Sequence, residues 1–109
     1  MIKKYKVIID PQAKADLKEV FIYVSVNDRI ESANKLLDGL EETCLKLEKY
    51  PERRHMPPEL RQTGIKNYLE ILYKPYRIIY EIESNLIYIH SVLDGRRNIQ
   101  EILNNRILR

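Results

Sequence analysis

The spacing of apolar residues changes once along the chain, and this change limits the available folds more than any other feature. From Ala13 to Leu47 apolar residues recur every three or four positions, which is typical of amphipathic helices that pack by one face. From residue 66 to residue 93 they follow the alternating or two-sided pattern of strands. Residues 51–63 keep neither period and are rich in proline, which predicts a loop with one helical turn around the sequence PPEL.

Two helices are expected before this loop. Asp10 and Pro11 favour a helix start, because an aspartate side chain accepts bonds from the first free amides and proline fits the first turn. This helix should end near residues 27–28, and a second helix follows almost at once. Pro51 ends the second helix, since the residue before a proline is pushed out of the helical region. The two helices predict an antiparallel hairpin, preceded by a short strand in YKVIID at residues 5–10.

Three strands are expected after the loop, in residues 66–73, 76–82 and 86–93. In the middle strand, YRIIYEI, alternation places Arg77 on the face opposite Tyr76 and Ile78. The last strand, LIYIHSVL, is apolar on both faces, which is typical of a central strand. Strict alternation along it puts His90 and Val92 on one face.

A short helix is expected to close the chain. Asn98 favours its start, with Glu101 three residues later in the position of a capping box. The resulting order is strand, helix, helix, three strands, helix (β-α-α-β-β-β-α). This order predicts one α+β domain over residues 1–109, with the helical hairpin packed on one face of a small, mainly antiparallel sheet.

The composition excludes several classes of site. Cys44 is the only cysteine, so neither an internal disulfide nor a cysteine-based zinc site can form, and a small buried residue is expected there. The two histidines lie far apart without a metal motif, and no cofactor is expected. No apolar run reaches the roughly 18 residues of a membrane span or has the form of a signal peptide, which predicts a cytoplasmic protein without membrane contact. The net charge of +3 permits an acidic partner without requiring one.

Three arginines are candidates for a functional role. Arg77 interrupts an apolar strand, where a guanidinium needs a carboxylate or phosphate partner. Glu70 and Glu81 are the carboxylates expected near it. Arg96 and Arg97 lie between a strand end and a helix start, where free amides and guanidinium groups can converge on a phosphate. Their spacing alone favours the alternative, a solvated turn.

The segment from Tyr50 to Leu103 resembles the RelE/ParE superfamily of bacterial toxins from type II toxin–antitoxin modules. The most specific parts are YRIIYEI and VLDGRRN, while YPE and the PELR…GI loop point to the ParE-like branch. The resemblance implies the fold described above and an antitoxin, encoded alongside, whose C-terminal segment wraps the toxin. RelE-like members cleave messenger RNA in the ribosomal A site, and ParE-like members are poisons of DNA gyrase.

The resemblance also assigns roles to individual residues. If the chain is a ribonuclease, Arg77 and Arg97 match the arginines that stabilise charge on the phosphate. The lysines of RelE-like enzymes are replaced here by Tyr68 and Glu70, and their C-terminal tyrosine by Leu103. The groups that remain for acid–base work are Glu70, His55 and Tyr80.

A docking surface is the other role for these residues. ParE-like members often have HGRR where this chain has DGRR, so Asp94 puts a carboxylate beside the arginines and weakens any phosphate site. The residues expected to bind a target or an antitoxin are Arg61, Arg77, Asp94, Arg96 and Arg97.

Three functions remain open at this point. The first is a ParE-like, non-catalytic toxin that binds DNA gyrase. The second is a ribosome-dependent mRNA endonuclease that uses Arg77 and Arg97. The third is a degenerate toxin fold that only binds an antitoxin. All three predict a complex with an antitoxin whose binding segment is amphipathic, with apolar side chains for a groove and acidic ones for the arginines.

Overall fold

The computed structural model describes residues 4–107 and has the predicted order of elements. The main elements are β1 (Lys6–Ile9), α1 (Pro11–Asn27), α2 (Ile30–Leu45), β2 (Tyr68–Tyr73), β3 (Tyr76–Glu83), β4 (Leu86–Asp94) and α3 (Ile99–Arg106). Three single turns of 3₁₀ helix lie between α2 and β2: η1 (Lys46–Glu48), η2 (Pro51–Arg53) and η3 (Pro58–Leu60). The expected α+β class is confirmed, and η3 is the turn predicted at PPEL.

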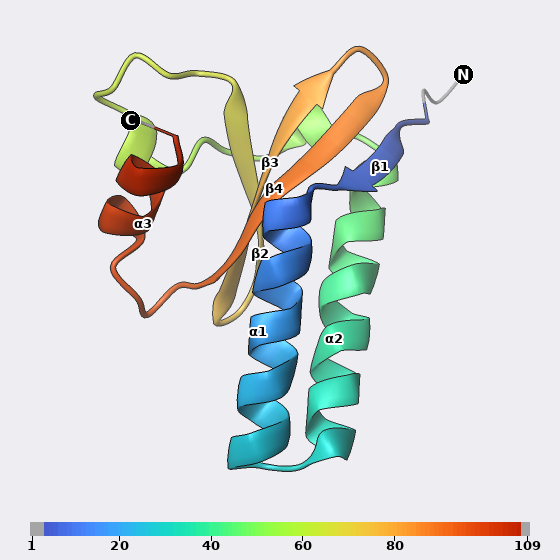
Figure 1. Cartoon of the computed structure of the whole chain (residues 1–109). Coiled ribbons are helices and arrows are strands. Elements are labelled where there is room, and N and C mark those ends of the chain that lie inside the picture. Colours follow the sequence, from blue (N-terminus) through green and yellow to red (C-terminus); the bar gives the residue numbers. More distant parts are fainter. Residues whose placement is uncertain (1–3, 108–109) are drawn as a thin grey trace.

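The strands form one sheet in the order β1-β4-β3-β2. The pairs β2–β3 and β3–β4 are antiparallel, and β1 runs parallel to β4. The apolar strand β4 is therefore central, as its sequence predicted. Figure 1 shows α1 and α2 side by side as an antiparallel hairpin, with α3 lying apart from them across the sheet.

Each face of the sheet has its own core. The hairpin face is filled by apolar residues of α1, α2 and three strands, including Leu17, Leu40, Cys44, Ile78, Tyr80 and Ile89. The α3 face is filled by Leu60, Ile79, Leu93, Ile99 and Leu103. Cys44 is the small buried residue that its position predicted. These two cores hold the sheet between the hairpin and α3, because each covers one apolar face.

The alternation predicted for β4 is wrong beyond Ile89. Tyr80 pairs with Ile89 and Ile79 pairs with Ser91, so a β-bulge leaves His90 without a direct partner on β3. An extra residue in one strand shifts the following side chains to the opposite face. Val92 consequently joins the hairpin core with Ile89 instead of sharing a face with His90.

The predicted helix caps are right at one end of the chain and wrong at the other. The side chain of Asp10 makes no capping bond, and α1 begins with the backbone bond from the Lys14 amide to the Asp10 carbonyl. The Asn98 side chain does cap α3, because its Oδ1 accepts a bond of 3.1 Å from the Glu101 amide. The helix α2 ends at Leu45, before the expected stop at Pro51, and continues as the tighter turn η1.

A membrane-spanning helix is not found in the described part of the chain.

Candidate functional site

Arg77 lies at the centre of a four-residue network on the α3 face of the sheet. Its Nε donates to Oε1 of Glu70 at 2.7 Å. Its two terminal nitrogens donate to the two carboxylate oxygens of Glu59 at 2.8 and 2.6 Å. The other oxygen of Glu70, Oε2, lies 2.7 Å from Nε2 of His55. Of the two carboxylates expected near Arg77, Glu70 is confirmed, whereas Glu81 instead accepts a bond from Asn67.

These four groups come from β2, from β3 and from the loop between α2 and β2. Glu70 and Arg77 come from the paired strands β2 and β3. Glu59 stands on η3, which is anchored because the next residue, Leu60, is fully buried in the α3-side core. His55 is held by its backbone, since its carbonyl accepts a 2.8 Å bond from the Glu70 amide in an isolated bridge. The loop between α2 and β2 is therefore an ordered part of the network.

The network is largely withdrawn from water. The Glu70 side chain is 3% exposed and the Arg77 side chain is 15% exposed. The hydrogen bond from Arg77 lowers the pKa of Glu59 below its ordinary value of 4.5. The same bond, together with Glu70, raises the pKa of Arg77 above that of a free guanidinium. Glu59 and Arg77 thus hold each other in the ionised state.

Arg96 and Arg97 lie at a different place, on a hollow between α1 and the end of β4. This hollow has a volume of about 380 Å³, and its lining includes Val20 and Tyr23 of α1, Tyr76 and Val92 of the sheet, and both arginines. Arg77 is not part of the lining. This hollow therefore brings Arg96 and Arg97 together without Arg77.

Asp94 binds Arg96 by three hydrogen bonds. The carboxylate accepts from the Arg96 amide at 2.9 Å, from Nε at 2.9 Å and from a terminal nitrogen at 2.7 Å. These bonds lower the pKa of Asp94. Arg97 is exposed and forms no ion pair within residues 4–107. Of the two neighbours, Arg97 is therefore the one whose guanidinium is available to a partner.

Gly95 explains how the turn beside these arginines closes. Its amide donates a 2.7 Å bond to the carbonyl of Pro75. A Cβ atom at this position would lie 2.9 Å from the same carbonyl oxygen and 3.3 Å from the side chain of Arg77. Contacts under 3.0 Å force the backbone to move, so the turn requires a residue without a side chain.

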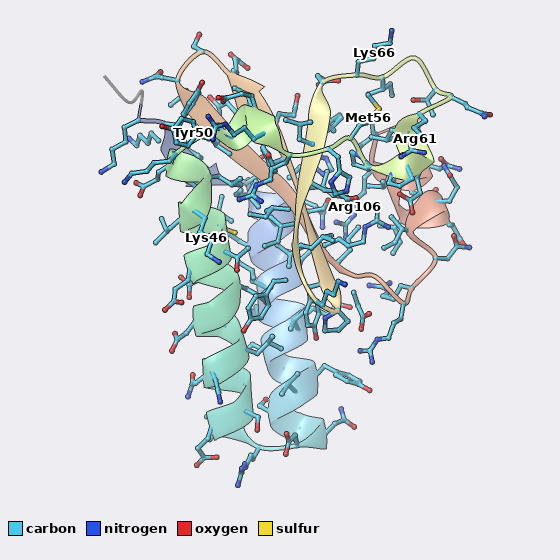
Figure 2. The ribbon with its side chains drawn as sticks, turned by 180° about the vertical axis from the view of Figure 1, so that it is seen from behind. Lys46, Tyr50, Met56, Arg61, Lys66 and Arg106 are labelled. Carbon is cyan, nitrogen blue, oxygen red and sulfur yellow. The ribbon has the colours of Figure 1, made fainter. Side chains whose placement is uncertain are left out.

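The remaining predicted site residues lie in separate places. Arg61 follows η3 and is exposed at the surface (Figure 2). Tyr80 is fully buried, its hydroxyl donates to the Pro51 carbonyl at 2.5 Å, and burial raises its pKa. This position removes Tyr80 from the candidates for acid–base work. His55 is exposed, and Glu70 orients its ring. Within residues 4–107 no cluster of three or more acidic, histidine or cysteine side chains is placed to hold a metal ion.

Sequence reasoning missed Asp16, which is buried beside the same hollow. Its Oδ2 accepts a 2.9 Å bond from the Val92 amide, at a point on the β4 edge that β1 does not reach. Both of its oxygens also accept bonds from Arg106 of α3. The sequence did indicate that Asp16 is buried, because it falls between Ala13 and Leu17 on the apolar side of α1.

Comparison with known protein families now identifies the chain. The family described as the ParE toxin of the type II toxin–antitoxin system, parDE, matches residues 7–99. The chain belongs to the ParE toxin family. This match runs from the second residue of β1 to the first residue of α3 and confirms the expected RelE/ParE superfamily, so the protein is a type II toxin–antitoxin toxin.

Solved structures agree on the fold of this ParE-family toxin. The chromosomal ParDE system from P. aeruginosa matches with a TM-score of 0.69 and 15% identity, over 83% of this chain and 95% of that chain. The RelBE2 toxin–antitoxin complex from Mycobacterium tuberculosis matches with a TM-score of 0.63 and 18% identity, over 86% and 94%. At these identities the likeness shows the fold alone. A comparison with curated protein sequences finds no match.

Proposed function

We propose that this ParE-family toxin acts by binding DNA gyrase as a protein inhibitor and that a cognate antitoxin neutralises it. The observation that carries the proposal is that two carboxylates already bind Arg77. RNA cleavage by 2′-hydroxyl attack needs a cation that meets the charge developing on the phosphate. Here the guanidinium of Arg77 already bonds to Glu59 and Glu70, and the three groups together carry a net negative charge. A phosphate approaching them meets repulsion instead of stabilisation.

The other predicted nuclease groups support the same conclusion. Tyr80 is buried, and Arg96 is bound by Asp94, so neither the phenol of Tyr80 nor a free pair of Arg96 and Arg97 faces a substrate. A surface that is already paired in this way suits docking to a protein, where side chains act by shape and charge complementarity without proton transfer.

A ribonuclease remains a second candidate because of one contact. The ring of His55 is held by the buried carboxylate of Glu70 at 2.7 Å, an arrangement that fixes a tautomer and orients a general base. Arg97 lines the hollow between α1 and β4, whose lining does not include His55, so it does not complete this arrangement. Cleavage of translated messages in cells that express the wild-type chain, abolished by His55→Ala, would favour this candidate over inhibition of gyrase.

We propose that the antitoxin binds the hollow between α1 and β4. Its apolar lining includes Val20 and Tyr23, and Arg97 offers a charge for an acidic side chain of the partner. Glu19 of α1 also lines it and Asp94 is already paired with Arg96, so an acidic side chain of the partner should meet Arg97. The ParDE and RelBE2 structures named above are described as toxin–antitoxin systems or complexes, which supports a partner of this kind.

The central experiment separates the two activities. Purified toxin is added to gyrase supercoiling and cleavage assays and, in parallel, to a translation reaction with a labelled message. We expect loss of supercoiling, unaffected message, and relief of the inhibition by the co-purified antitoxin. Intact supercoiling without a trapped cleavage complex would remove gyrase as the target. Normal growth of cells induced to make the chain alone would instead favour a degenerate, antitoxin-binding fold.

A further inference from the structure

A second hollow lies at the free edge of β2, away from the hollow assigned to the antitoxin. Its volume is about 260 Å³. The lining comes from the end of α2 and η1 (Thr43 and Lys46), from the following loop (Arg54 and His55) and from β2, beginning at Glu70. Since β2 is the outermost strand, this hollow opens where the sheet ends.

The lining carries an excess of positive charge. Lys46 and Arg54 are exposed, and neither forms an ion pair with any residue in the 4–107 range. Glu70 is the only carboxylate in the lining, and both of its oxygens are taken by Arg77 and His55. Lys46, Arg54 and Arg77 together carry three positive charges, and Glu59 and Glu70 carry two negative ones. The hollow and the network behind it therefore carry one net positive charge while His55 is neutral. They carry two when His55 is protonated.

The ring of His55 is oriented by Glu70 through one of its two nitrogens. Its Nε2 is committed to the Glu70 carboxylate, which places the proton on that nitrogen when the ring is neutral. Within residues 4–107 no group hydrogen-bonds to the other nitrogen, Nδ1. A ring that carries a proton on Nδ1 as well can donate from that nitrogen to an anion in the hollow.

Aromatic and basic groups continue the surface beyond this hollow. Tyr50 is exposed, and the guanidinium of Arg53 lies 3.9 Å above its ring. Figure 2 shows Lys46 and Tyr50 at the same end of α2. Cations beside an aromatic ring are typical of surfaces that follow a nucleic-acid strand, where phosphates meet the cations and bases stack on rings or guanidinium planes. Glu48 and Glu52 occur in the same stretch, but neither lines the hollow.

We propose that this β2-edge hollow binds a backbone phosphate of a nucleic-acid strand through Lys46, Arg54 and His55. The proposal goes beyond inhibition of a protein target, because it gives the toxin a direct contact with the nucleic acid itself. It uses none of the residues of the α1–β4 hollow, so it can be tested separately from the gyrase and antitoxin proposals.

The test measures binding of the full chain to a fluorescein-labelled single-stranded oligonucleotide of about twelve nucleotides, at several salt concentrations. The double variant Lys46→Gln/Arg54→Gln should bind at least about tenfold more weakly, and the salt slope should fall by about two. The charge-preserving variant Lys46→Arg/Arg54→Lys should bind like the wild type. The matched control Lys18→Gln/Lys35→Gln removes two exposed lysines from α1 and α2 outside the hollow and should change little.

Titration with inorganic phosphate, followed by the NMR signals of the His55 ring, distinguishes the source of the phosphate. If phosphate shifts the His55 ring signals but the oligonucleotide does not bind, the hollow is a phosphate site. The proposal that it binds a nucleic-acid strand is then overturned. Equal weakening by the hollow variant and the control would mean non-specific attraction and would overturn the site. Absence of both responses would overturn it as well. Inhibition of gyrase is read in a separate assay, so its failure and the failure of this site are distinguishable.

Discussion

Asp16 and Arg106 form a two-point ion pair that joins the first helix of the chain to the last. The terminal nitrogens of Arg106 donate to the two oxygens of Asp16 at 2.8 and 2.9 Å. One of them also donates to Ser91 at 2.9 Å. The strand β1 pairs with β4 only as far as Ile89. The Val92 amide lies beyond that point, and Asp16 accepts its hydrogen bond. Figure 2 shows Arg106 on the sheet side of α3.

Removal of one partner should destabilise the fold strongly. Asp16→Ala leaves Arg106 without its carboxylate and the Val92 amide without an acceptor, in a region where Asp16 is 6% exposed. We expect the free energy of unfolding to fall by about 3 kcal/mol, measured by urea denaturation. Glu19→Ala, at an exposed position on the same helix, is the control and should change it by less than about 0.5 kcal/mol. Equal effects of the two variants would contradict a structural role for the pair.

Arg77 and Arg97 should respond differently to substitution. Arg77→Ala leaves the carboxylates of Glu59 and Glu70 facing each other without a cation, so it should lower the free energy of unfolding by about 2 to 4 kcal/mol. Arg97→Ala should leave stability within about 0.5 kcal/mol, because its side chain is exposed and unpaired within the described residues. We expect Arg97→Ala to weaken antitoxin binding, measured by isothermal titration calorimetry. A stable Arg77→Ala variant would show that the network contributes little.

Acid should weaken the fold through Glu59. Its pKa in the folded chain is lowered by Arg77 below the ordinary value of 4.5. The resulting stabilisation is present above pH 4.5 and is lost as pH falls from there through the folded-state pKa. The variant Glu59→Gln should therefore show a smaller drop in unfolding free energy between pH 5 and pH 3, followed by urea denaturation. Asp94→Asn is the comparison, since its lowered pKa has the same sign but its partner Arg96 is exposed and water screens the pair. A Glu59→Gln chain with the full acid sensitivity of the wild type would count against the Arg77 bond.

Gly95→Ala should distort the turn before α3. The new methyl group would meet the Pro75 carbonyl at 2.9 Å, which the backbone can relieve only by moving. We expect a loss of about 1 to 3 kcal/mol in the free energy of unfolding and shifted amide signals around residues 94–98 in NMR spectra. Gln62→Ala, at an exposed loop position, should be close to neutral. Unchanged amide signals in Gly95→Ala would mean that the turn tolerates a side chain.

The candidate site could be predicted from the sequence only in part. The family motif marked Arg77, Arg96 and Arg97, and the strand alternation placed Arg77 on the face opposite Ile78. The partner Glu59 could not be found in this way, because it lies in an irregular loop whose distance to β3 depends on how Leu60 packs. His55 was marked as a candidate, but its contact with Glu70 requires the bridge that only the folded loop forms.

The periodic parts of the chain were determined by sequence alone. Apolar spacing and the proline-rich break between residues 51 and 63 fixed the helical hairpin, the strand order along the chain and the central place of β4. Tertiary structure decided the features that depend on distant segments: the bulge at His90, the pairing of Asp16 with Arg106, and the pairing of Arg77 with Glu59. The physical reason is that periodicity is a local property of the backbone. The partner of a buried charge or of an open strand edge is set by whichever segment packing brings there.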